Sequence, residues 1–453
     1  MDINNDNIKE NPKALLPLLI FLGLFLITGL ILLNRGVENP FYQFPMPIAV
    51  SIGVVFAFIL FEGSIEEKMN TFLAGMGEKN ILTMCTIYLL AGAFSSVSQA
   101  MGGVDSVVNL GMSLIPIKYL AIGLFLITAF ISISTGTSMG TLAAVVPIAI
   151  GLTDKTGMSL AFVMAIVIGG AMFGDNLSII SDTTIAATTT QNVEMKDKFR
   201  INIYIAIPAA VITIILLFFF SGNPEVIEGV TYNYSFLKVI PYLFVLIFAV
   251  AGMNVFGVLT SGIFLSGVIG FFSGELTLLS ITKEAYSGFT SMQNVFLVSL
   301  ITGGLAYMIL KEGGIQYLVN SIEKRVGGKK SGELGISALV ALTDAAIANN
   351  TVSIIINGPI AKRISNSFKI DPRKIASLLD IFACVMQGAL PYGAQILMVM
   401  GLTKGAVGPI DIIPLLWYQM LLAIFGILSI YIPFADGYIN KNPWDFEQDE
   451  VAA

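Results

Sequence analysis

The sequence predicts an all-α protein that crosses a membrane many times. Of the 453 residues, 55% are hydrophobic and only 12% are charged, whereas about a quarter of the residues of a soluble protein are charged. Several apolar segments are close to the roughly 20 residues that a helix needs to cross the hydrocarbon core of a bilayer. Polar residues interrupt some of these segments, as in the broken helices that line transport pathways.

Composition also excludes several classes of function. The chain has no His, which removes the commonest zinc ligand and the usual proton carrier at neutral pH. Proton chemistry therefore falls to Asp, Glu, Lys or Tyr. No basic block predicts nucleic-acid binding, and no HExxH, GxGD or DDxxD motif predicts an intramembrane enzyme. We expect no cofactor and no enzymatic activity.

The first repeat is predicted at residues 14–220, after a polar tail at residues 1–13. Its membrane spans are predicted at 14–33, 45–61, 81–100, 160–191 and 201–220. A short amphipathic segment at 105–115 lies at the surface or braces a hairpin. Two apolar pieces, 119–134 and 142–152, flank the polar stretch TGTSMGT, and the second piece is too short to span. This pair therefore predicts a re-entrant hairpin.

The second half, residues 225–434, repeats the first and precedes a tail at residues 435–453. A shift of 211 residues without gaps superposes the following positions: Leu89 on Leu300, Gly92 on Gly303, Gly102-Gly103 on Gly313-Gly314, Val108-Asn109 on Val319-Asn320, Ser138 on Asn349, and Asn176 on Gln387. Polar breaks thus fall on polar breaks, which is the best sequence pointer to a transporter binding site. Each half has five crossings and one hairpin, and the odd number of crossings inverts the second repeat relative to the first.

The basic residues predict the orientation. With both termini in the cytoplasm, 18 of the 24 Lys and Arg residues fall inside, Lys198 and Lys374 among them. The six that fall outside are Arg35, Lys118, Lys155, Lys238, Lys283 and Lys404. We therefore expect ten crossings in the plasma (inner) membrane of a prokaryote. Related folds often dimerise, so a homodimer in the lipid bilayer is one expected assembly.

The stretch Gly169–Gln191 carries the first candidate site. Asp175 and Asp182 lie within eight residues of each other, and a charge at mid-bilayer costs roughly 2.5–3.5 kcal/mol on insertion scales. Small hydroxyl residues and Gly around them suit an unwound helix that faces a polar cavity. The predicted ion-binding residues are Asp175, Ser178, Ser181, Asp182 and Thr183, with Asp175 and Asp182 as the metal ligands. The alternatives are a solvated loop, or an Asp182 that only caps the restarting helix.

Polar residues at the corresponding places of both halves complete the candidate site. The predicted substrate-binding residues are Thr137, Ser138, Asn176, Asp344, Asn349, Asn350, Thr351, Gln387 and Tyr392. The alternative for the second hairpin is hydrogen bonding between helices, worth roughly 0.6 kcal/mol per bond. The alternative for the second break is a plain kink at Pro391. Asp380 lies six residues beyond Lys374, so an interfacial position and an ion pathway both stay open.

The stretch GDNLSIISDTT resembles the NhaC family of sodium/proton antiporters, in which a GD-x-x-S-x-x-SDTT signature recurs. It keeps Gly174, Asp175, Ser178, Ser181, Asp182, Thr183 and Thr184. ANNTVSIIINGPIAKRI and SLLDIFACVMQGALPYGAQ resemble the C-terminal half of that family. Asn176 departs from the pattern, in which a Lys often follows the Asp. The resemblance implies an ion-coupled transporter built from inverted repeats, and relatives of the family also move malate, lactate and other organic solutes.

The predicted function is sodium/proton antiport by alternating access, in which the intramembrane Asp residues hold the exchanged ions. The alternative is a sodium- or proton-coupled transporter of an amino acid or small carboxylate on the same scaffold, because amides are abundant in the second half. A channel shares many of these features but fits poorly with two mirrored hairpins.

Overall fold

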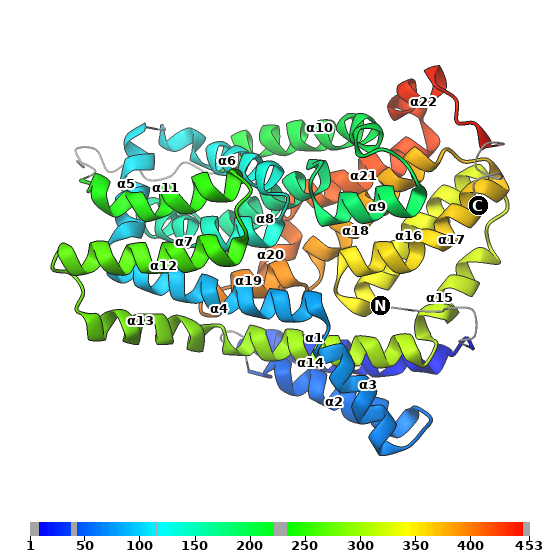
Figure 1. Cartoon of the computed structure of the whole chain (residues 1–453), viewed down its shortest axis with the longest axis horizontal. Helices are drawn as coiled ribbons and strands as arrows, with labels where there is room; N and C mark the ends of the chain where they lie inside the picture. Colours follow the sequence, from blue (N-terminus) through cyan, green and yellow to red (C-terminus); the bar gives the residue numbers. More distant parts are fainter. Residues whose placement is uncertain (1–8, 38–42, 115, 222–232, 447–453) are drawn as a thin grey trace.

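Helices make up nearly all of the ordered structure in a computed structural model that describes residues 9–37, 43–114, 116–221 and 233–446. These ranges contain no strand. In Figure 1 most long helices lie along the long axis of the molecule, with α5 and α13 at one end and α15 and α22 at the other. The predicted all-α class is confirmed.

The helices of the first half, where η denotes a short 3-10 helix, are η2 (Pro12–Leu15), α1 (Leu16–Asn34), α2 (Met46–Leu60), α3 (Ile65–Met76), α4 (Lys79–Ala100), α5 (Gly103–Leu114), η3 (Ile117–Tyr119), α6 (Leu120–Thr135), α7 (Ser138–Thr156), α8 (Leu160–Leu177), α9 (Asp182–Gln191) and α10 (Met195–Phe220). Those of the second half are α11 (Phe236–Val250), α12 (Val255–Phe272), α13 (Leu278–Ser291), α14 (Gln293–Lys311), α15 (Gly314–Glu323), α16 (Lys329–Ile347), α17 (Asn350–Phe368), α18 (Pro372–Ala389), α19 (Ala394–Leu402), α20 (Pro409–Ile412), η4 (Ile413–Leu415), α21 (Trp417–Tyr431), η5 (Pro433–Ala435) and α22 (Gly437–Lys441). The loop between the halves lies mostly outside the described residues.

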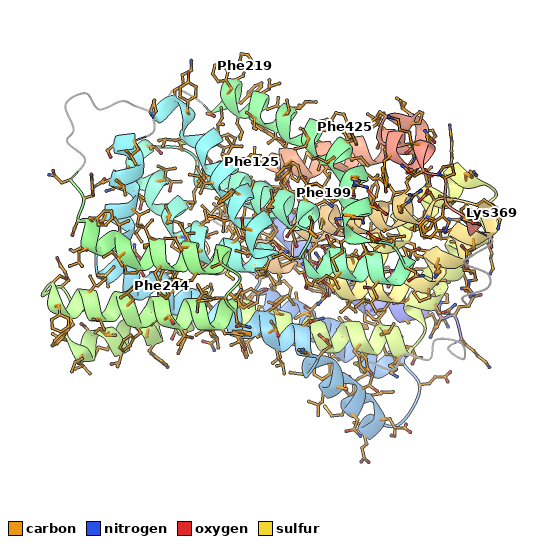
Figure 2. The ribbon with its side chains drawn as sticks, turned by 45° about the horizontal axis from the view of Figure 1, so that its top comes forward. Phe125, Phe199, Phe219, Phe244, Lys369 and Phe425 are labelled. Carbon is orange, nitrogen blue, oxygen red and sulfur yellow. The ribbon has the colours of Figure 1, made fainter. Side chains whose placement is uncertain are left out.

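The protein is a multi-pass membrane protein. Within the described ranges, seven helical segments are long and apolar enough to cross a bilayer, and the bent pair Pro409–Leu415 and Trp417–Tyr431 makes an eighth. The shorter apolar helix α2 occupies the crossing predicted at 45–61, and a further short apolar stretch, Phe236–Phe248, lies in α11. Large apolar side chains also face outward: Phe219 on α10 is 72% exposed, whereas Phe125 on α6 is buried (Figure 2). Ten crossings and an inverted second half stay predictions.

The helix bounds correct the register of the repeat around the candidate site. α5 and α15 begin at Gly103 and Gly314, as the predicted shift of 211 requires. Beyond them the helix starts differ by 212: Leu160 and Pro372 for α8 and α18, Ser138 and Asn350 for α7 and α17, and Asp182 and Ala394 for α9 and α19. The ungapped shift was therefore wrong by one residue here. Asp175, rather than Asn176, corresponds to Gln387.

The two hairpins turn in the same way. Gly136 follows α6 in the left-handed region at φ 67°, and Thr137 then caps α7 by accepting a hydrogen bond from Gly140 N. In the second hairpin Ala348 takes the left-handed region at φ 56°, and Asn349 caps α17. A non-glycine residue there costs roughly 1–2 kcal/mol. α7 is longer than the predicted 142–152, because the polar residues on both sides of that piece are helical as well.

Two amphipathic helices, α3 and α13, were not predicted. Ser64 and Glu67 form a capping box at the start of α3, which explains why a charged segment becomes helical there. α13 crosses α4 where Gly288 meets Gly92, and a Cβ on either glycine would collide with the backbone of the other. Gly75 of α3 lies equally close to α14, because a Cβ on Gly75 would collide with the backbone oxygen of Gly303. These crossings brace the helices that flank the site.

Each hairpin packs against the broken helix of the other half. α17 of the second hairpin packs on α9, and α7 of the first hairpin packs on α19. Both breaks, residues 178–181 and 390–393, contain four residues. Two hairpin tips and two helix breaks therefore meet at the centre of the molecule.

Candidate functional site

Asp175 is the carboxylate at the centre of the candidate site. It lies in the last turn of α8 and is only 3% exposed. Ser138 Oγ donates to its Oδ2 at 2.8 Å, and Ser181 Oγ donates to its Oδ1 at 2.7 Å. Hydroxyl groups are neutral donors, so both oxygens are hydrogen-bonded while the negative charge is left uncompensated.

Asp182 is the first residue of α9 and reaches the same place from the other side of the break. Its Oδ2 accepts a hydrogen bond from Thr351 Oγ1 of α17 at 3.1 Å. Ser181, and not Asp182, occupies the N-cap position of α9. The Asp182 carboxylate also accepts hydrogen bonds from backbone N–H groups at the start of α9, so its ion-binding role and the capping alternative both stay predictions.

A cavity of about 110 Å³ joins the two carboxylates. Its described lining residues are Asn80, Thr83, Met84, Ile87, Thr137, Ser138, Met139, Asp175, Asp182, Asn349, Asn350, Thr351, Gln387, Ala394 and Gln395. A single water needs roughly 10–15 Å³ of cavity volume, so the cavity has room for several waters or a hydrated cation. Two carboxylates and many neutral oxygens line it, and none of these residues is basic.

The cavity contains eight of the fourteen predicted site residues. These are Asp175, Asp182, Thr137, Ser138, Asn349, Asn350, Thr351 and Gln387. Two more lie behind the lining: Ser181 Oγ donates to Asp175, and Thr183 Oγ1 lies 2.8 Å from Ser181 Oγ. Asp344 is fully buried beside Gln387.

Three predicted site residues lie away from the cavity. Ser178 Oγ donates to Ile133 O of α6 at 2.7 Å, so it holds the break against the first hairpin. The Tyr392 hydroxyl donates to Ala345 O, and its ring packs on Phe21 with 5.4 Å between centroids. Asn176 points into a separate polar cluster, described below.

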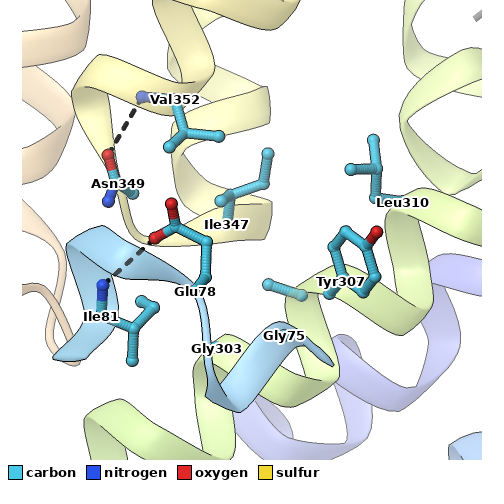
Figure 3. A pocket seen from close by; sticks show the side chains of 10 residues that line it. Gly75, Glu78, Ile81, Gly303, Tyr307, Leu310, Ile347, Asn349 and Val352 are labelled. Atoms are coloured by element: carbon cyan, nitrogen blue, oxygen red, sulfur yellow. Dashed lines mark hydrogen bonds between the residues drawn. The ribbon is translucent and has the colours of Figure 1, made fainter. Parts of the chain in front are cut away.

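The contribution of α4 to the lining of the cavity was not predicted. Asn80, Thr83 and Ile87 lie on one face of this helix at spacings of three and four residues, the pattern by which they could have been found. A smaller pocket of about 30 Å³ adjoins the cavity at Asn349. Figure 3 shows Asn349 and Glu78 in this smaller pocket, each accepting a hydrogen bond from the first turn of its own helix.

A buried ion pair lies behind the break. Lys198 of α10 pairs with Asp380 of α18, and their side chains are 1% and 0% exposed. Lys198 Nζ also donates to Asn176 O at 2.6 Å and to Thr184 Oγ1 at 2.9 Å, while Asn176 Nδ2 donates to Asp380 Oδ2 at 3.1 Å. Asn202 Nδ2 donates to Asn176 O at 3.1 Å. Because a helix leaves its last carbonyls free, a cation at the end of α8 is favourable.

Two lysines that were counted on the cytoplasmic side, Lys198 and Lys374, are buried within the protein. Lys374 Nζ lies 3.0 Å from Asp436 and 3.5 Å from Glu333. For Asp380, which the sequence left open, the structure gives a buried position with a basic partner.

No cluster of three or more His, Cys, Asp or Glu side chains that could hold a metal ion occurs in the described ranges. A cation at this site would therefore be held by the two carboxylates together with hydroxyl and amide oxygens. Such hard oxygen ligands suit Na+ rather than a transition metal.

Comparison with known proteins gives consistent matches. A malate-2H+/Na+-lactate antiporter of Bacillus subtilis is 24% identical over 97% of this chain and 98% of its own length. The Na+/H+ antiporter NhaC of the same organism is 24% identical over 92% of this chain and 96% of its own. The crystal structure of the Alcanivorax borkumensis YdaH transporter covers 96% of this chain and 100% of its own, with 14% identity and a TM-score of 0.41.

The sequence profile of the Na+/H+ antiporter family matches residues 11–221 and again residues 226–434. The two matched segments span nearly the whole chain and meet between α10 and α11. The chain belongs to the Na+/H+ antiporter family.

Proposed function

We propose that this protein exchanges Na+ for H+ across the plasma membrane of a prokaryote by alternating access. Na+ binds in the central cavity between Asp175 and Asp182, and the site returns with a proton. Both termini lie in the cytoplasm, the second repeat is inverted relative to the first, and two copies form a homodimer.

The charge of the cavity carries this proposal. Asp175 and Asp182 line the cavity, whereas none of its described lining residues is Lys or Arg. The Asp175 carboxylate receives only neutral hydroxyl donors. A buried carboxylate of this kind attracts a small cation or a proton and repels an organic anion. Competition between Na+ and H+ for such a group is the basis of exchange.

The polar residues that line the cavity with Asp175 suit Na+. Hydroxyl and amide groups such as those of Ser138 and Asn350 are the ligand types that replace water around a hard cation. The breaks leave helix ends free to contribute backbone carbonyls. The hairpin tips bring these groups from both halves, so a movement of one half against the other would open and close the site.

Two corresponding pockets support alternating access. A pocket of about 340 Å³ is lined by Gly92, Ser95, Ser96 and Gln99 of α4, together with residues of α5, α7 and α13. The 211 shift relates these four residues to Gly303, Ala306, Tyr307 and Leu310, which line the pocket of about 30 Å³ in Figure 3. The first pocket is wide and the second is small, as expected of a carrier that is open on one side and closed on the other. In the proposed orientation the wide pocket faces outward.

Exchange that also involves a small organic carboxylate is the second candidate. The relative named for malate and lactate aligns with 97% of this chain. Asn349, Asn350, Gln387 and Gln395 also place four side-chain amides at the cavity. The absence of a basic residue among the lining side chains argues against an anionic solute, which would have no cationic partner there.

Purified protein in liposomes separates the two candidates. An inward Na+ gradient is imposed, and the internal pH is followed with a trapped dye, first without any organic solute and then with malate or lactate. Proton efflux driven by Na+ alone is the result that we expect. Proton movement that requires malate or lactate would support the second candidate and overturn the first.

A further inference from the structure

Six basic side chains lie at the end of the molecule opposite α5 and α13, where α15, α16 and α17 meet (Figure 1). They come from three segments of the second half: Lys324 and Arg325 follow α15, Lys329 and Lys330 begin α16, and Lys362 and Arg363 lie in the last two turns of α17. We call these six residues the basic patch.

Packing holds the three segments together. Val326, in the turn between α15 and α16, and Ile364 of α17 both lie next to Gly332 in the first turn of α16. Arg363 Nη2 lies 3.2 Å from Glu323 Oε1, which joins α17 to the end of α15. The basic patch is therefore one continuous surface at the base of the second hairpin.

Most of the charge of the basic patch is not balanced by acidic side chains. Arg325, Lys329 and Lys362 form no ion pair with any described residue. Lys324 and Arg363 have acidic partners at 3.7 and 3.2 Å, but their side chains are 72% and 66% exposed. Exposed pairs of this kind are weak and exchange readily with other anions.

Other acidic side chains at this end of the molecule have buried basic partners. Glu333 of α16 and Asp436 both pair with Lys374, and Asp371 pairs with Arg373. Lys374 and Arg373 are each 4% exposed, so these charges cancel inside the protein. An excess of positive charge is left on the surface.

The basic patch lies at the level where the chain leaves the membrane. Lys330 Nζ lies 5.5 Å from the ring centroid of Tyr431, the last residue of the bent membrane segment that contains α21. Tyr is typical of the interface between hydrocarbon and water. Ile355 lies seven residues before Lys362, on the same face of α17, and is 50% exposed. Positive charge thus adjoins exposed apolar area along the hairpin.

We propose that the basic patch binds the headgroups of anionic phospholipids, whose acyl chains pack on the exposed apolar face of the second hairpin. Phosphate groups are good acceptors for Arg and Lys, and basic clusters beside membrane helices attract anionic lipids. A soluble anion would meet the charges but not the apolar face, so we expect it to bind more weakly.

The position of the basic patch gives the bound lipid a structural effect. α16 and α17 carry Asn349 and Thr351 at their tip to the central cavity. Lipid headgroups that contact both helices and the end of α15 would hold the base of this hairpin together. The inference does not depend on Na+/H+ exchange, because it concerns a surface away from the cavity.

Thermal stability in the presence of lipid tests the proposal. Purified protein in detergent at low salt is titrated with dioleoylphosphatidylglycerol or with dioleoylphosphatidylcholine, and the thermal midpoint is followed by intrinsic fluorescence. We expect phosphatidylglycerol to raise the midpoint of the wild type saturably and phosphatidylcholine to leave it unchanged. The increase should disappear in about 1 M KCl, because the screening length is then only about 3 Å.

A matched pair of variants locates the effect. Arg325→Gln/Lys329→Gln/Lys330→Gln should lower the apparent affinity for phosphatidylglycerol on the order of 100-fold, since each basic residue near an anionic lipid surface contributes about fivefold. Arg35→Gln/Lys118→Gln/Lys283→Gln removes the same charge outside the basic patch and should keep the wild-type affinity. All six side chains are exposed, so both variants should fold.

Four results would overturn the inference. Wild-type affinity in the variant of the basic patch would place the lipid elsewhere, and equal losses in both variants would make the effect one of net charge. Equal stabilisation by inorganic phosphate would make the surface a site for soluble anions. Native mass spectrometry counts bound lipids and subunits, and a patch variant that loses a partner subunit but no lipid would make this face an interface between copies.

Discussion

Two buried carboxylates at the centre of the molecule, Asp380 and Asp175, have different partners. Asp380 pairs with Lys198, accepts a hydrogen bond from Asn176 and is 0% exposed. Asp175, one residue before Asn176, is 3% exposed, has two hydroxyl donors and lines a cavity. The negative charge of Asp380 is balanced by a lysine within the protein, whereas the partners of Asp175 are two neutral hydroxyl groups.

This difference separates support from binding. A buried ion pair whose hydrogen bonds are all made has no free polar atom that could bind a ligand. Loss of one member leaves the other charge unpaired. Lys198 also holds the end of α8 through Asn176 O, so the pair fixes the backbone from which Asp175 projects. We therefore assign a structural role to the region behind the break, and in our proposal the region in front of it binds the ion.

The largest effect is expected for Asp175→Asn. The amide keeps the shape of the side chain but removes the charge, and loss of a charged contact lowers affinity by roughly 100-fold. Na+-driven proton movement in liposomes should fall to the background of empty vesicles, while the yield and thermal stability of the protein stay at wild-type levels. Full transport by this variant would mean that the cation binds elsewhere.

Lys198→Met should act on stability instead. The unpaired Asp380 would cost about 3–5 kcal/mol, seen as a large fall in the thermal midpoint by fluorescence-detected size exclusion. Adding Asp380→Leu removes the stranded charge and should recover much of that loss. If Lys198→Met instead keeps its stability and loses only transport, the pair belongs to the binding machinery.

A smaller effect distinguishes two serines of the break. Ser181→Ala removes a donor to Asp175 and should weaken Na+ binding by roughly tenfold, since a hydrogen bond to a charged group is worth about 1.5–3 kcal/mol. Ser178→Ala, the matched control, removes a bond to the Ile133 carbonyl and should leave Na+ affinity unchanged. Equal losses of affinity in the two variants would place Ser178 in the site after all.

The smallest effect is expected at the surface. Lys155 and Asp105 form an ion pair of 2.8 Å, but Asp105 is 70% exposed. Exposed pairs are worth about 0–1 kcal/mol, so Lys155→Met should move the thermal midpoint little. Comparison with Lys198→Met isolates the contribution of burial. A large loss of stability in Lys155→Met would show that burial is not what separates the two pairs.

Local patterns predicted most of the fold. Apolar runs gave the spans, and Gly/Ser/Thr-rich or amide-rich interruptions gave both hairpin tips and both breaks. α3 and α13 were missed because their charged and polar residues lack a membrane-span signature. The register error arose from a single extra residue in the second half, between the start of α15 and the end of α16, which an ungapped comparison cannot absorb.

The site was predictable in part, for a physical reason. Residues that share a break or a tip, such as Asp175 and Ser181, are close in sequence, so their proximity could be inferred. The pairing of Lys198 with Asp380 joins helices from opposite halves, and no local pattern encodes it. Asn80 and Thr83 share one face of α4 by their spacing, but that this face reaches the cavity follows from the packing of α4 on α7 and α19.

Equilibrium binding of radioactive Na+ to purified protein tests the central claim most directly. Wild-type protein and the double variant Lys198→Met/Asp380→Leu should both bind Na+ saturably, whereas Asp175→Asn should bind none above background. Saturable wild-type binding by Asp175→Asn, together with loss of binding in the double variant, would place the cation at the ion pair and contradict the account.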